Sequence, residues 1–198
     1  MSRKLEIDSH YIHRTTLFSM YGSDGECVVF LGDSITEMCE WREFFPEIRI
    51  INRGISGDST AGVLNRLDQI IGLNPEKIFL TIGVNDLQRH YPKDEVISNI
   101  REIILKLSGS TGAIIFLQSI LPVREMMLQT GIKNSTIDEV NASLAVVARE
   151  LNIQFLDNNA LLKDISGNLS LDFTSDGLHL NGYAYSRWAM NIKEKVIG

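Results

Sequence analysis

Five short apolar runs alternate with amphipathic segments along most of the chain, and this alternation restricts the fold more than any other sequence feature. The apolar runs cover residues 27–31, 48–52, 77–82, 113–118 and 153–156. Segments with helical periodicity lie at about 36–45, 59–71, 93–108, 136–151 and 181–196. Strands that are apolar throughout and alternate with helices are typical of a parallel sheet covered on both faces. The sequence therefore predicts a doubly wound α/β fold, a three-layer α/β/α sandwich of about five strands.

The chain shows no linker, low-complexity tract or internal repeat that would mark a domain boundary. Its 198 residues are enough for one well-buried domain, whereas two domains would each be small. We expect a single domain over 1–198. Residues 1–25 are mildly apolar, and we expect them to form a lead-in helix that packs on the rest of the domain. Glycines at 22 and 25 would end this helix.

Charge and composition exclude several classes of function. The formal net charge is −6, which disfavours nucleic acid or an anionic membrane as a partner. No apolar run approaches the length of a transmembrane helix, and the first residues lack the apolar core of a signal peptide, so we expect a cytoplasmic protein. Four histidines and two cysteines show no zinc-type spacing, and the glycines from 54 to 62 lack a Gly-Lys-Ser/Thr ending. We expect neither a metal nor a cofactor.

Each apolar run leads into a polar or glycine-bearing loop. In a doubly wound sheet these loops meet at the carboxyl ends of the strands, where ligands bind. The loops are Gly32-Asp33-Ser34 after the first run, residues 52–59 after the second, Gly83-Val84-Asn85-Asp86 after the third, residues 119–124 after the fourth, and residues 172–179 beyond the fifth.

Three of these loop residues have the chemistry of nucleophilic catalysis. Ser34 follows the first strand at the start of a helix, where backbone N–H groups and the helix dipole favour negative charge. A serine needs a histidine to take its proton, and the histidine needs a carboxylate to orient it. His179 and Asp176 are three residues apart and can lie side by side. We predict Ser34 as nucleophile, His179 as base and Asp176 as orienting group.

An oxyanion needs preorganised hydrogen-bond donors. The backbone N–H of Ser34, the backbone N–H of Gly57 and the side-chain amide of Asn85 are the candidates. The missing Cβ of Gly57 would let a substrate approach its backbone closely.

Other polar residues near the site have ordinary explanations. His90 follows the Asn85 loop and is a competing base, but we interpret it as a rim residue; His10 and His13 are interpreted as structural. Asp33 and Asp58 are interpreted as turn-stabilising groups rather than acid/base carboxylates.

The loop motifs, taken together and in order, resemble the SGNH (GDSL-type) hydrolases. The matching blocks are Gly32-Asp33-Ser34, Gly57 with its neighbours, Gly83-Val84-Asn85-Asp86 and Asp176-Gly177-Leu178-His179, spanning residues 27–182. The resemblance implies a flavodoxin-like sheet of order 2-1-3-4-5, the same catalytic residues, and an oxyanion hole of Ser34, Gly57 and Asn85. Within the family the chain looks most similar to the short branch with platelet-activating-factor acetylhydrolase subunits and bacterial carbohydrate O-acetylesterases. That branch favours acetyl groups and often forms homodimers.

The resemblance also suggests residues that select the substrate. Ile35 and Leu178 match positions where bulky side chains narrow the acyl pocket in that branch, so we predict a preference for acetyl. Arg124 and Arg89 are candidates for binding an acidic leaving group, or are solvated rim charges.

We therefore expect a serine esterase acting on a small acyl ester, acetyl above all, of a carbohydrate or similar alcohol. The alternatives are a lysophospholipase or acyl-thioesterase of the same family, or a non-catalytic carbohydrate-binding module on the same fold.

Overall fold

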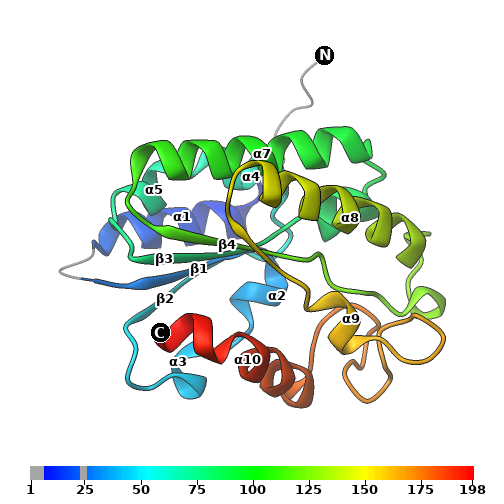
Figure 1. Cartoon of the computed structure of the whole chain (residues 1–198). Coiled ribbons are helices and arrows are strands. Elements are labelled where there is room, and N and C mark those ends of the chain that lie inside the picture. Colours follow the sequence, from blue (N-terminus) through cyan, green and yellow to red (C-terminus); the bar gives the residue numbers. More distant parts are fainter. Residues whose placement is uncertain (1–6, 23–25) are drawn as a thin grey trace.

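The computed structural model describes residues 7–22 and 26–198, and its centre is a parallel sheet in the order β2-β1-β3-β4-β5 (Figure 1). The strands are β1 (Val28–Gly32), β2 (Ile50–Gly54), β3 (Lys77–Thr81), β4 (Ile114–Gln118) and β5 (Gln154–Leu156). Each strand pairs in parallel with its neighbour. The predicted α/β fold and its strand order of 2-1-3-4-5 are confirmed.

Helices cover both faces of this sheet. They are α1 (Ser9–Met20), α2 (Ser34–Glu37), α3 (Trp41–Phe44), α4 (Thr60–Asn65), α5 (Asp68–Ile71), α6 (Val84–Gln88), α7 (Lys93–Ser110), α8 (Asn134–Glu150), α9 (Asn159–Leu162), α10 (Gly182–Ile197) and the 3-10 helix η1 (Glu125–Met127). In Figure 1 helices α1, α4, α5, α7 and α8 lie on one side of the sheet, and α3 and α10 lie on the other. Within the described ranges, no helix combines the length and the apolar character needed to cross a membrane.

Two predicted helices are each divided in the structure, and one strand is displaced. The segment 36–45 forms two helices, α2 and α3. The side-chain amide of Asn52 donates hydrogen bonds to the carbonyl groups of Thr36, Glu37 and Cys39, which are then not used to continue α2. The segment 59–71 forms α4 and α5, with Arg66 at the end of α4. The second strand spans 50–54 rather than 48–52, because Gly54 pairs with Gly32 and extends the strand beyond its apolar run.

The lead-in segment contains a helix, as predicted. Helix α1 begins after Asp8, whose side chain caps the N–H of Tyr11, and ends at Met20. Residues 1–6 and 23–25, including most of the expected break after the helix, lie outside the described residues.

An aromatic ladder forms the centre of the core and fixes β1, the strand that leads to Ser34. Phe30 of β1 pairs in register with Phe79 of β3, and Phe79 pairs with Phe116 of β4. The Phe30–Phe79 and Phe79–Phe116 ring centroids are 4.9 and 4.6 Å apart. Trp41 of α3 stacks on Phe30 at 3.9 Å. Burying each such side chain contributes roughly 1.5–3 kcal/mol, so this ladder holds the middles of β1, β3 and β4 together.

Candidate active site

The predicted site residues gather at the carboxyl edge of the sheet. Ser34 is the first residue of α2, directly beyond β1, and Gly57 lies in the loop between β2 and α4. Asn85 lies in α6, directly beyond β3. Asp176 and His179 lie in the segment before α10. Five positions separated by up to 145 residues therefore meet at the edge where doubly wound sheets bind their ligands.

Ser34, His179 and Asp176 form a continuous chain of polar contacts. The Nε2 atom of His179 lies 3.1 Å from Oγ of Ser34, and its Nδ1 lies 2.7 Å from Oδ2 of Asp176. The other carboxylate oxygen, Oδ1, accepts the backbone N–H groups of Leu178 at 2.9 Å and His179 at 2.8 Å. Both oxygens of Asp176 are therefore engaged, and the imidazole ring has one fixed orientation.

The Asp176 carboxylate is held in its charged form. Partial burial raises the pKa of Asp176, but hydrogen bonds from the His179 ring and from the Leu178 and His179 amides outweigh it and lower the pKa to about 2. A charged carboxylate against Nδ1 favours the tautomer that carries a proton on Nδ1, which leaves the Nε2 lone pair facing Ser34. This arrangement is able to accept the serine proton.

Asp33 fixes the turn that presents Ser34. Its Oδ1 accepts the N–H of Ile35 at 3.0 Å and caps α2, and its side chain is almost fully buried. Because Ser34 is the first residue of α2, its own N–H has no partner within the helix. The interpretation of Asp33 as a turn-stabilising group is confirmed.

Two buried carboxyl groups near this turn give stability a predictable dependence on pH. Burial, together with the nearby charges of Asp58 and Asp86, raises the pKa of Asp33 from 3.8 to about 7, and burial raises the pKa of Asp86 from 3.8 to about 6. The native state then holds protons that the unfolded chain has released. The contribution of these two groups to the free energy of unfolding is fully present below 3.8, the pKa of an aspartate in the unfolded chain. It is lost as the pH rises through their native pKa values of about 6–7.

We expect the variant Asp33→Asn to lose less thermal stability than wild type between about pH 5 and about pH 8. The asparagine oxygen is able to keep the cap on Ile35 but does not ionise. The difference should be on the order of 1.4 kcal/mol for each pH unit over which only the native state holds the proton. Melting temperatures of wild type, Asp33→Asn and the exposed-site control Asp172→Asn test this. Parallel curves for wild type and Asp33→Asn would contradict it.

The candidate oxyanion donors come from three different elements. Gly57 has a φ of +77°, a conformation that residues with a side chain rarely adopt, and its N–H donates none of the backbone hydrogen bonds found among the loops and turns of the described residues. Asn85 is buried, and its Nδ2 donates to the Asp58 carbonyl at 3.0 Å. This bond uses one amide hydrogen, and an amide nitrogen carries two. Together with the N–H of Ser34, these groups have the chemistry that an oxyanion requires.

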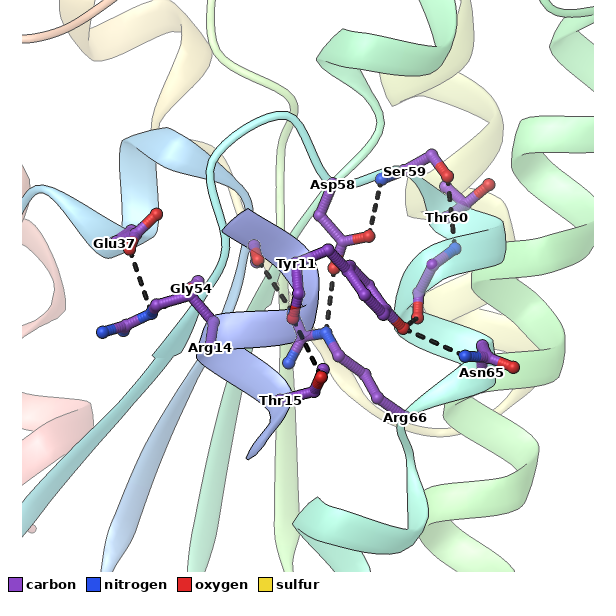
Figure 2. A network of polar contacts seen from close by, with 12 residues as sticks. Tyr11, Arg14, Thr15, Glu37, Gly54, Asp58, Ser59, Thr60, Asn65 and Arg66 are labelled. Atoms are coloured by element: carbon purple, nitrogen blue, oxygen red, sulfur yellow. Dashed lines mark hydrogen bonds and ion pairs between the residues drawn. The ribbon is translucent and has the colours of Figure 1, made fainter. Parts of the chain in front are cut away.

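A buried ion pair supports the loop between β2 and α4. Asp58 accepts from Nε of Arg66 at 2.9 Å and from the N–H of Ser59, which agrees with its predicted role in the turn (Figure 2). Arg66 also donates to the Gly32 carbonyl at 3.1 Å. Arg66 could not be singled out from the sequence, because it lies in an amphipathic segment where a charged residue is typical of the exposed face.

The two arginines singled out from the sequence both brace loops of the site. Arg89 donates through Nη2 to the Gly57 carbonyl at 2.9 Å. Arg124 forms an ion pair with Asp164, and its backbone N–H donates to the Gly177 carbonyl at 2.8 Å. The charge of Arg124 thus has a carboxylate partner within the protein, and its binding of an acidic leaving group stays a prediction.

The remaining predicted residues occupy the surroundings of the site. Ile35 is buried in the hydrophobic core, and Leu178 is partly buried against it. His90 is exposed after α6, whereas the ring that reaches Ser34 belongs to His179. Within 7–22 and 26–198, no three histidine, cysteine or acidic side chains gather as a metal site would require.

The sequence of the site region matches a known family. Residues 30–187 fit the model of the GDSL-like lipase/acylhydrolase family. The chain belongs to this family. It is therefore a carboxylic ester hydrolase, and the family resemblance found in its motifs is confirmed.

Individual relatives agree with this assignment. The platelet-activating factor acetylhydrolase IB subunit alpha2 of Homo sapiens is 28% identical over 178 residues, which cover 86% of this chain and 76% of that protein. The solved GDSL-like lipase of Bacteroides thetaiotaomicron is 26% identical with a TM-score of 0.83, covering 94% of this chain and 96% of the other. The fold is also shared by an acetylxylan esterase from Geobacillus stearothermophilus, which is 20% identical. The match has a TM-score of 0.71 and covers 89% of this chain and 96% of the esterase chain.

Proposed function

We propose that this family member is a serine esterase that removes a small acyl group, acetyl above all, from a carbohydrate or similar alcohol. The observation that carries the proposal is the contact chain from Ser34 through His179 to Asp176, with links of 3.1 and 2.7 Å. These three groups are what acyl transfer through a serine requires.

In the first half of the reaction, Oγ of Ser34 attacks the ester carbonyl while Nε2 of His179 takes its proton. The N–H groups of Ser34 and Gly57 and the amide of Asn85 stabilise the oxyanion; removing one such donor typically costs about 10²–10³ in kcat. The tetrahedral intermediate collapses to an acyl-serine, and His179 gives the proton to the departing alcohol. In the second half, water attacks the acyl-serine while His179 takes its proton, and the carboxylic acid is released as Ser34 regains its proton from His179.

The preference for acetyl is supported by the acetylhydrolase relative and by two apolar neighbours of the catalytic groups. Ile35 follows Ser34 directly, and Leu178 precedes His179 directly. Side chains of this size beside the carbonyl leave little room for a long acyl chain. The roles of Ile35 and Leu178 as walls of the acyl pocket remain predictions.

We expect p-nitrophenyl acetate to be hydrolysed with a kcat/KM at least about 10-fold above that of the octanoate ester. Trimming one wall, in Leu178→Ala, should raise the octanoate rate relative to the acetate rate. The exposed-site variant Leu171→Ala serves as the control and should leave the ratio unchanged. A wild-type enzyme that prefers octanoate would overturn the acetyl preference and favour the lysophospholipase or thioesterase alternative.

We expect the alcohol half of the ester to bind beside Gly57. A hollow of about 80 Å³ lies beside Gly57 and is lined by Asp8, Tyr11, Ser56, Gly57, Asp58 and Arg89. Its lining is rich in hydroxyl, carboxylate and guanidinium groups, which suits the hydroxyls of a sugar better than an alkyl chain. The non-catalytic alternative is disfavoured, because the chain belongs to a family of hydrolases.

A further inference from the structure

Glu37 connects the helix that begins at Ser34 with the loop that carries Gly57. Glu37 is the last residue of α2, one turn beyond Ser34. Its Oε2 accepts the backbone N–H of Ser56 at 2.5 Å and the Ser56 hydroxyl at 2.6 Å. Ser56 directly precedes Gly57, so this carboxylate holds the residue next to a candidate oxyanion donor.

Two side chains of α1, Arg14 and His10, face the same carboxylate. Nε of Arg14 lies 3.0 Å from Oε1 of Glu37, and Nε2 of His10 lies 3.0 Å from Oε2 (Figure 2 shows the Arg14 contact). The Glu37 side chain is only 15% exposed. Burial alone would raise the pKa of Glu37, but the Ser56 hydrogen bonds, His10 and Arg14 outweigh it and lower the pKa. The carboxylate is therefore charged when it holds Ser56.

Helix α1 is itself fixed to the elements around the site. The Tyr11 hydroxyl donates to the Gly62 carbonyl of α4 at 2.9 Å, and the side chain of Gln69 donates to the Thr15 carbonyl at 3.0 Å. Phe18 packs with the Arg14 and Arg53 guanidinium groups over its ring. The side chains of His10 and Arg14 that face Glu37 thus come from an anchored helix rather than from a loose terminal segment.

The backbone of Glu37 has equally little freedom. A Cβ on Gly54 would lie 2.2 Å from the backbone nitrogen of Glu37, so the missing side chain at the end of β2 lets α2 rest directly on the strand. The amide of Asn52 donates to the Glu37 carbonyl at 3.1 Å. A rigid residue on α2 therefore holds the adjacent loop through a charge-assisted pair of hydrogen bonds.

We propose that Glu37 is a positioning residue for the oxyanion hole, which sets the N–H of Gly57 relative to Ser34 and is itself held by His10 and Arg14. Oxyanion donors act only when they lie about 2.7–3.1 Å from the developing charge, so the loop and the nucleophile need a fixed relative position. The catalytic part of this proposal rests on the esterase function proposed above. The mechanical part, in which Glu37 orders the loop 54–59, does not.

The test compares wild type with Glu37→Gln and Ser56→Ala. The glutamine keeps the size of the side chain but loses the charge, and the alanine removes only the hydroxyl contact. Burst titration with p-nitrophenyl acetate counts intact active sites, so kcat is expressed per titrated site. We expect a loss of about 10- to 100-fold in kcat for Glu37→Gln with KM within about 2-fold, and a smaller loss for Ser56→Ala.

Hydrogen–deuterium exchange supplies a readout that does not depend on activity. The amides of 54–59 should exchange at least about 10-fold faster in Glu37→Gln, because a hydrogen bond to a charged carboxylate is stronger than one to a neutral amide. His10→Ala should produce part of this effect. His13→Ala, on the same helix and exposed, should produce none.

The outcomes separate the proposals. Unchanged exchange in 54–59 for Glu37→Gln would overturn the positioning role, and so would a kcat per site equal to that of wild type. Faster exchange with normal kcat would show that Glu37 is structural only, which also overturns it. A wild-type protein inactive on all esters would refute the esterase function, while exchange alone would still decide whether Glu37 orders the loop.

Discussion

Replacement of Ser34 by alanine is expected to lower kcat for p-nitrophenyl acetate by at least about 10⁴-fold. The Ser34 hydroxyl is the atom that would form the acyl bond, and the only group it contacts by hydrogen bonding within the described chain is His179. Removing it should leave the cap from Asp33 to Ile35 and the surrounding core in place. Steady-state rates and the amplitude of the pre-steady-state burst measure the effect.

A matched control separates loss of chemistry from loss of fold. Ser135 is exposed in the first turn of α8, and Ser135→Ala should keep the wild-type rate. Circular dichroism and melting temperature of Ser34→Ala should stay close to those of wild type. Full activity in Ser34→Ala would mean that another group performs the attack.

The second largest effect is expected for Asp176→Asn, with a loss of about 10²–10⁴-fold in kcat. The asparagine oxygen is able to keep accepting the N–H groups of Leu178 and His179, which preserves the loop. The new NH₂ group then faces Nδ1 of His179 and favours the tautomer with its proton on Nε2. That tautomer is unable to take the proton of Ser34. In a serine protease the corresponding change costs about 10⁴-fold; the exposure of Asp176 reduces the expected loss here.

Asp172→Asn makes the same chemical change four residues earlier. Asp172 is exposed, and only its backbone takes part in the hydrogen bonds of the described structure. We expect a rate within about 2-fold of wild type for this control. Equal rates for Asp176→Asn and wild type would show that the carboxylate does not orient His179.

The parts of the structure that could be predicted from sequence are those encoded over short distances. The strands β1, β3 and β4 could be predicted because each is apolar over most of its length and is buried almost throughout. The neighbours Asp176 and His179 could be proposed as a pair because three residues of chain bring them together. The place of Ser34 beside them follows from the rule that parallel strands end at one edge of the sheet.

The supporting network could not be predicted, because its partners are chosen by tertiary packing. Glu37 finds Arg14 and Ser56 across 23 and 19 positions of sequence, and nothing local marks any of the three. In the sequence they look like solvated polar residues of helices and loops. The same reason applies to Arg124: its ion pair with Asp164, 40 residues away, has no local signal in the sequence.

Trapping the acyl-enzyme tests the central claim most directly. The wild-type protein is mixed with p-nitrophenyl acetate, quenched with acid during the burst, digested and analysed by mass spectrometry. The proposed mechanism predicts one acetyl group on the peptide that contains Ser34, located on Ser34 itself and absent from Ser34→Ala. Acetyl on a different residue, or turnover without any acylated peptide, would contradict it.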